Sequence, residues 1–175
     1  MEHPAPLVID PREHAAEIAR FWAHVVRGPG EDDCWLWTGA ISDDGYGRYW
    51  LKRAGRQRVV RPHRYALSLA LGRPLAADEV AMHGCDSPIC VRAGVHAAAG
   101  GHVVLGTQAD NLRDMAIKRR GGGWPGWMHV ARSSERVARS RALRAAVSGG
   151  WDAGRVRAAL DAAELAVHPG QHRLF

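Results

Sequence analysis

A small set of cysteines and histidines constrains this chain more than any other feature. Cys85 and Cys90 stand in the segment "HGCDSPIC", and Cys34 lies upstream in "CWLWTG". Three cysteines would leave one unpaired in a disulfide framework, whereas short-spaced cysteines near histidines are typical of metal ligands in a reducing compartment. Tetrahedral Zn²⁺ takes four nitrogen or sulfur ligands, so one histidine would complete the set. The alternative is three small buried cysteines in a reduced core. The candidate histidines are His83, His96 and His102.

Composition is compatible with one globular domain carrying an appendage. The 175 residues are 46% hydrophobic, and no run approaches the roughly 18 uninterrupted apolar residues of a membrane helix. The N-terminal residues lack the basic and apolar regions of a secretory signal, which predicts an intracellular protein without a membrane partner. A net charge of +6, carried almost entirely by arginine, makes polyanions candidate partners.

The first half of the sequence predicts a helix, a strand, a hairpin and a second helix. Residues 10–27 have apolar side chains at helical spacing, with Asp10 as the expected N-cap. The segment "CWLWTG" at 34–39 predicts a short strand. "RYWLKR" and "RQRVVRP", at 48–62, predict a β-hairpin around "AG", and "HRYALSLALG" at 63–72 predicts a buried helix.

Residues 79–119 predict two strands followed by a helix. "EVAMH" and "HVVLG" are the strands, separated by the cysteine-bearing loop, and "TQADNLRDMAIKRR" is a helix with Thr107 as the expected cap. Residues 121–130 are rich in Gly, Trp and Pro and predict a linker. Residues 131–175 predict a basic extension of two helices with an extended tail.

Taken in order, "CWLWTG", "GYGRYWLKR", "HRYAL", "H-x-C-D-x-x-x-C" and "HVVLGTQADNLRDM" resemble the HNH nucleases of bacteriophages. They are similar in particular to the zinc-bearing branch close to the His-Cys box homing endonucleases. The resemblance covers roughly residues 34–120 and implies an HNH nuclease domain over residues 1–120. The implied class is α+β: a small zinc-stabilised ββα-metal (His-Me finger) core with an antiparallel hairpin, an N-terminal helix and a C-terminal helical extension.

The resemblance also assigns roles to individual residues. His83 corresponds to the general base of the family, Asn111 to the ligand of a catalytic Mg²⁺ or similar divalent cation, and Arg48 to the arginine that contacts the scissile phosphate. The family's structural zinc ligands correspond to Cys34, Cys85, Cys90 and His102.

The fourth zinc ligand is the least certain correspondence, because "RAGVHAAAGG" replaces a shorter link of the family. By its spacing from Cys90, His96 is a rival ligand. We prefer His102, because its register to "LGT" and Asn111 matches the family pattern.

Several basic segments predict contact with double-stranded DNA. No acidic residue interrupts the basic residues between positions 48 and 64, which would form a basic hairpin face or a charged, solvated edge. The two C-terminal helices would anchor DNA or form a packing hairpin. A homodimer is a further candidate, and Gln171–Phe175 resembles a sliding-clamp binding motif or matches it by coincidence. The expected DNA-binding residues are Arg48, Lys52, Arg53, Arg56, Arg58, Arg61 and Arg64.

Together these observations predict a metal-dependent DNA endonuclease of phage or mobile-element type. It would hydrolyse phosphodiester bonds with a His-activated water in the cytoplasm of a bacterial host or phage-infected cell. The alternatives are a catalytically silent zinc-stabilised DNA-binding protein and a phage packaging accessory.

Overall fold

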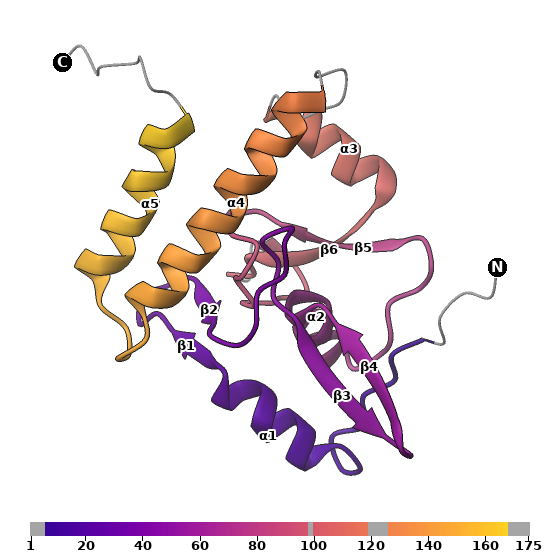
Figure 1. Ribbon diagram of the computed structural model, residues 1–175. Helices are drawn as coiled ribbons and strands as arrows, with labels where there is room; N and C mark the ends of the chain where they lie inside the picture. Colours follow the sequence, from indigo (N-terminus) through magenta and orange to yellow (C-terminus); the bar gives the residue numbers. More distant parts are fainter. Residues whose placement is uncertain (1–5, 98–99, 119–125, 168–175) are drawn as a thin grey trace.

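The computed structural model describes residues 6–97, 100–118 and 126–167, and within them the chain is a mixed α+β fold. Its strands form three two-stranded antiparallel sheets (Figure 1). The helices of the described residues are α1 (Ala15–Ala23), α2 (Pro62–Leu71), α3 (Gln108–Ile117), α4 (Gly126–Ala146) and α5 (Ala153–Val167). The strands are β1 (Val25–Arg27), β2 (Trp35–Trp37), β3 (Tyr49–Arg53), β4 (Arg56–Val60), β5 (Glu79–His83) and β6 (Val103–Thr107).

The predicted helix over residues 10–27 is wrong at both ends. The Asp10 carboxylate accepts hydrogen bonds from the backbone N–H groups of Arg12 and Glu13, which makes a separate turn before α1. At the other end, Val25 and Val26 form β1 and pair with β2. These β-branched residues are half-buried in the strand pair, which outweighs the apolar spacing that favoured a helix.

The other predicted elements of the first 118 residues are confirmed. The hairpin β3–β4 turns at Ala54 and Gly55, both with positive φ, and Gly72 ends α2 in the left-handed conformation. Residues 79–118 form β5, β6 and α3 in the predicted order. Thr107 caps α3 in a reciprocal capping box with Asp110.

An aromatic cluster forms the centre of the main core. The ring of Phe21, on α1, lies 5.4 Å from Trp37, 5.3 Å from Tyr49 and 4.6 Å from Tyr65, measured between centroids. Beside this cluster, the Glu17 carboxylate accepts hydrogen bonds from Arg53 and from the Tyr65 hydroxyl. This network joins α1 to the hairpin and to α2.

The C-terminal helices belong to the same core. Leu143, Val147 and Val156 are buried and pack in one cluster with the aromatic residues of α1, β2 and β3. α4 and α5 lie side by side along one flank of the molecule (Figure 1). α4 begins at Gly126, so the predicted linker over residues 121–130 is wrong from that residue onward. Residues 121–125 of the predicted linker, and the candidate clamp-binding tail, lie outside the described residues.

A second, smaller apolar cluster attaches β5 and β6 to the body. Leu67 of α2 packs against Ala81 of β5 and Val103 of β6, and all three are buried. The cysteine-bearing loop between these strands is therefore held against α2. Within the described part of the chain, no helix is long and apolar enough to cross a membrane.

Replacing Leu143 by alanine tests whether α4 belongs to the core. The side chain is 1% exposed, so its truncation should lower the free energy of unfolding by about 2–5 kcal/mol. Chemical denaturation followed by circular dichroism measures the change. The matched control is Leu112→Ala on α3, where the side chain is 56% exposed, and this variant should unfold close to the wild type. Equal curves for the two variants would contradict the shared core.

Candidate metal centre and the adjoining histidines

Cys34, Cys85, Cys90 and His102 lie close enough together to bind a metal ion such as zinc. Their ligand atoms all fall within 4.8 Å of one another. The Nδ1 atom of His102 lies 3.5 Å from the Cys34 sulfur and 3.8 Å from the Cys90 sulfur. A tetrahedral zinc with its usual bond lengths requires sulfur–nitrogen separations of about 3.6 Å. The geometry therefore fits a Cys₃His site without rearrangement of the loops.

Backbone pairing brings the distant Cys34 to this cluster. The segment before and after Cys90 runs along β2: Trp37 N–H donates to the Ile89 carbonyl and Val91 N–H to the Trp35 carbonyl, both at 2.8 Å. Cys34 immediately precedes β2, and Cys90 forms a bridge with Leu36. The pairing of these two segments therefore places two of the four ligands side by side.

The thiols interact strongly with one another in the absence of a cation. Hydrogen bonds from Cys34 and Cys90 lower the pKa of Cys85, while its negative charge and hydrogen bond raise the pKa of Cys34. Burial raises the pKa of Cys90. Three adjacent thiolates repel each other, and a bound dication removes this penalty and deprotonates all three.

Arg139 gives an independent indication that the site suits an anionic metal centre. Its Nε atom is buried without a hydrogen-bond partner in the described part of the chain, and its positive charge partly offsets the rise in the pKa of Cys34. Zinc with three thiolates and a neutral imidazole carries a net charge of −1. The positive charge of the half-buried Arg139 on α4 would balance it, so both the donor set and this unpaired Nε–H fit bound zinc.

The loop of residues 92–101 explains why His102 rather than His96 joins the cluster. Gly94 and Gly101 touch at the base of the loop, where a β-carbon on either would lie 2.8 Å from the other's backbone. His102 and Val103 N–H groups both donate to the Arg92 carbonyl, which brings the chain back beside the cysteines. His96 lies on the far side of the contact between Gly94 and Gly101, where it is exposed.

His83 ends β5 next to the metal ligands. Its Nε2 atom lies 3.0 Å from the backbone carbonyl of Cys90, and its ring is half-buried. Burial lowers its pKa below the ordinary value for histidine. The neutral imidazole is therefore favoured at neutral pH.

Tyr46 and His63 lie beside His83, an arrangement that no pattern in the sequence indicated. The His63 ring centroid is 4.6 Å from that of His83, and the Tyr46 ring lies 5.3 Å from His63 and 6.2 Å from His83. His63 is buried, and its Nδ1 atom has no hydrogen-bond partner among the described residues. Burial lowers its pKa well below the usual value.

Two further predicted site residues lie on separate elements. Asn111 sits in the first half of α3, which packs on β5 and β6, and its amide lies 3.7 Å from the Met115 sulfur. Arg48 precedes β3, where its backbone N–H donates to Ala40 and its side chain is exposed. Within the described residues, no hydrogen bond joins Asn111 or Arg48 to His83.

Two acidic residues near the C-terminal end of α3 are paired with a lysine. Lys118 lies 3.0 Å from the Asp86 carboxylate and 2.9 Å from that of Asp114. Because Asp86 follows Cys85, this pair joins the end of α3 to the cysteine-bearing loop. The Asp110 side chain forms part of the cap of α3.

The basic residues expected to bind DNA are divided between the two faces of the β3–β4 hairpin and its flanks. Lys52 lies on the exposed face with Trp50 and Val59. Arg53 is paired with Glu17, at 2.7 Å. Arg56 and Arg58 lie with Arg53 around a pocket on the opposite side, which Leu7 and Leu51 also line. The flanking residues are Arg61, paired with Asp44 at 2.6 Å, and the half-buried Arg64.

Replacing the two histidines one at a time tests the metal centre. We expect the purified wild type to contain one zinc ion per chain, and His102→Ala to lose it and to unfold at lower temperature. His96→Ala is the matched control and should retain both the metal and the wild-type melting temperature. Elemental analysis and thermal denaturation measure the two effects. Full zinc content in the His102→Ala variant would refute the assignment.

Comparison with known proteins shows similarity to two phage proteins. The chain is 37% identical over 89 residues, or 51% of its length, to Protein 7.7 of Escherichia phage T7. It is 32% identical over 87 residues, or 50% of its length, to Protein 2.8 of the same phage. The matches span 59% and 52% of these two proteins. No protein-family model and no solved structure matches the chain. The chain is thus similar to T7 phage proteins over about half its length.

Proposed function

We propose that this protein is a metal-dependent DNA endonuclease of the HNH (His-Me finger) type, with a structural zinc. The contact between His83 and the Cys90 carbonyl carries the proposal. A carbonyl oxygen only accepts hydrogen bonds, so Nε2 must carry the proton and Nδ1 keeps its lone pair. The Cys90 backbone, fixed by the metal centre, therefore selects the tautomer that a general base needs.

The chemistry assigned to His83 is proton abstraction from water. In the proposed reaction, Nδ1 takes a proton from a water molecule, whose oxygen attacks the phosphorus atom. The bond between phosphorus and the leaving sugar oxygen breaks, and this oxygen takes up a proton from solvent. Arg48, exposed before β3, would stabilise the negative charge that develops on the phosphate.

Asn111 is the proposed ligand of the catalytic cation. Within the described residues, the Cys₃His cluster is the one group of three or more His, Cys, Asp or Glu side chains that converges on a metal-sized space. One neutral amide binds a cation weakly, so Mg²⁺ would take its other ligands from DNA phosphates and water. When bound, the cation supplies Lewis-acid stabilisation of the leaving oxygen.

Net charge and relatives support the proposed substrate and setting. The charge of +6 favours a polyanion, and the structural zinc, His83 and exposed basic residues are compatible with duplex DNA as substrate. The similarity to proteins of phage T7 fits a role in a phage-infected bacterial cell. The amide of Asn111 contacts Met115 rather than another candidate catalytic residue, which favours the catalytically silent DNA-binding protein as the second candidate.

Cleavage of supercoiled plasmid distinguishes the two candidates. With Mg²⁺, the wild type should convert it to nicked or linear product, and His83→Ala should reduce the rate by about 10²–10⁴-fold. Asn111→Ala should raise the Mg²⁺ concentration that half-maximal activity requires. His96→Ala, with an exposed side chain, is the control and should cut at the wild-type rate.

Zinc content should be unchanged in His83→Ala, so that a lost activity is not a lost fold. A wild type that binds diverse duplex DNA without cutting it would establish the silent alternative. Activity that persists in His83→Ala would remove this residue as the base.

A further inference from the structure

The loop of residues 42–46 is held in one conformation by Asp44. The Asp44 carboxylate accepts hydrogen bonds from the Ser42 hydroxyl and from the Tyr46 N–H, the latter at 3.1 Å. It also pairs with Arg61 at 2.6 Å. The Ser42 backbone N–H donates to the Tyr46 carbonyl, at 2.8 Å. These four interactions hold the loop in place and fix the position of Tyr46 beside His83.

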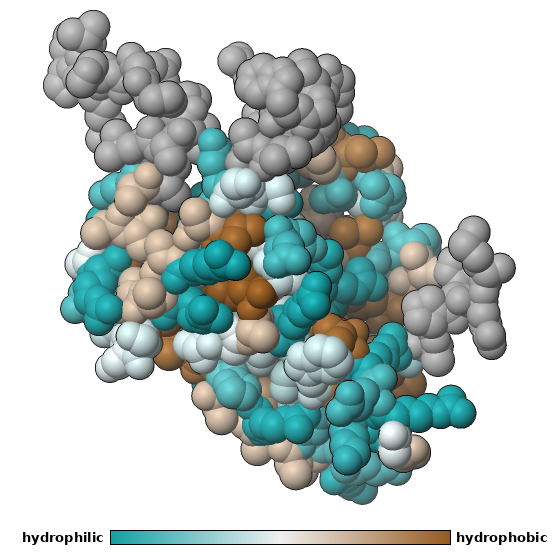
Figure 2. Space-filling model, in the orientation of Figure 1, coloured by the Kyte–Doolittle hydropathy of each residue, from teal (hydrophilic) through white to brown (hydrophobic). Residues whose placement is uncertain are grey.

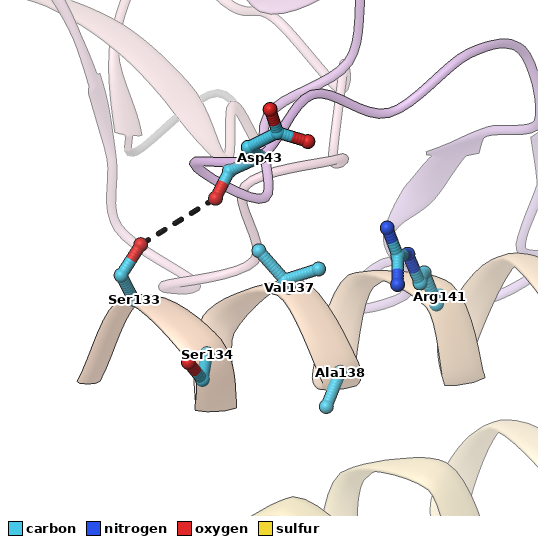
Figure 3. A pocket seen from close by; sticks show the side chains of 6 residues that line it. All are labelled: Asp43, Ser133, Ser134, Val137, Ala138 and Arg141. Carbon is cyan, nitrogen blue, oxygen red and sulfur yellow. Dashed lines mark hydrogen bonds between the residues drawn. The ribbon is translucent and has the colours of Figure 1, made fainter. Parts of the chain in front are cut away.

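Helix α4 packs directly against the same loop. Arg136 Nε donates to the Asp44 carbonyl at 2.6 Å, and Ser133 donates to the Asp43 carbonyl at 3.5 Å (Figure 3). Gly45 has φ of +83°, and a β-carbon there would lie 3.0 Å from the Arg136 carbonyl carbon. Both the positive φ and the close approach of Arg136 require glycine at position 45. The loop and α4 therefore form one continuous surface.

Two guanidinium groups flank Tyr46 on this surface. Arg61 lies 4.3 Å and Arg136 5.7 Å from the centroid of the Tyr46 ring. The same ring lies 6.2 Å from His83. Arg61 is 45% exposed, and the hydrogen bonds that the described residues provide use one terminal nitrogen of Arg61 and only Nε of Arg136. Both side chains therefore retain N–H donors for a ligand.

A hollow of about 470 Å³ continues this surface along α4, lined by Asp43, Ser133, Ser134, Val137, Ala138 and Arg141. Asp43 lies above the Ser133 end and Arg141 at the other end (Figure 3). On the face that Figure 2 shows, hydrophilic side chains lie beside hydrophobic ones over α4. Serine hydroxyls and arginines are the groups that contact DNA phosphates, and Asp43 would direct phosphates toward the arginine side.

We propose that the surface formed by residues 42–46, Arg61 and α4 binds the phosphodiester backbone of duplex DNA next to His83. Arg61 and Arg136 are its principal phosphate contacts. This inference rests on the proposed function, because it takes DNA as the substrate. It gives the C-terminal helices a part in positioning DNA, beyond their part in the core.

The dependence of DNA binding on salt tests the role of Arg136. Affinity for a fluorescent 30-base-pair duplex is measured in the His83→Ala background, without added Mg²⁺, over a range of salt concentrations. Arg136→Gln should weaken binding about tenfold and reduce the slope of log K against log salt by about 0.9. Arg136→Lys keeps the charge and should keep the slope. Arg157→Gln, an exposed position on α5, is the control and should change neither value.

A purely structural role predicts a different pattern. Lysine and glutamine both lose the fork that bonds Asp44 and stacks on Tyr46, so equal losses in affinity and melting temperature, with unchanged slopes, would overturn the proposal. Equal affinity for a duplex RNA of the same length would also overturn it. Because binding is measured without cleavage, a wild type that fails to cut plasmid while showing the Arg136-dependent slope would remove only the proposed catalysis.

Discussion

The backbone pairing between β2 and residues 89–91 is the interaction on which the rest of the site depends. It uses two hydrogen bonds of 2.8 Å, from Trp37 to Ile89 and from Val91 to Trp35. Through it, Cys34 and Cys90 meet although a long stretch of chain separates them, and Leu36 and Val91 are buried in the core. The same segment presents the Cys90 carbonyl to His83. The meeting of the candidate metal ligands, the core packing and the orientation of His83 thus depend on one short strand pair.

Helix α4 is the second element on which several features converge. Its buried side chains, Leu143 and Val147, pack in the aromatic core, while Arg136 holds the Asp44 loop and Arg139 lies near Cys34. Three turns of one helix therefore contact the core and the loop that carries Tyr46, and bring a positive charge near Cys34. In the sequence, arginines are the most prominent feature of this helix. In the structure, the helix supports the core, and its basic side chains interact with different neighbours.

Local chemistry was sufficient to predict most elements. Ala54 and Gly55 predict the hairpin because the tight turn requires positive φ, and Thr107 with Asp110 specifies the start of α3 through hydrogen bonds within one turn. The failures have a common cause. Residues 25–27 satisfy helical spacing but pair with β2, and the start of α4 at Gly126 contradicts the helix-breaking composition around it, because tertiary packing overrides weak local preferences.

The sequence alone determined which side chains are available to ligate a metal, and the resemblance to the family pattern, with its register from the zinc histidine to Asn111, favoured His102 over His96. Only the tertiary structure decided that His102 joins the three cysteines, because the contact of Gly94 with Gly101 closes the intervening loop and leaves His96 exposed. The proximity of Tyr46, His63 and His83 likewise comes from three separate segments. Short stretches of chain determine the residue types and the local turns, whereas the proximity of distant side chains depends on how the whole core packs.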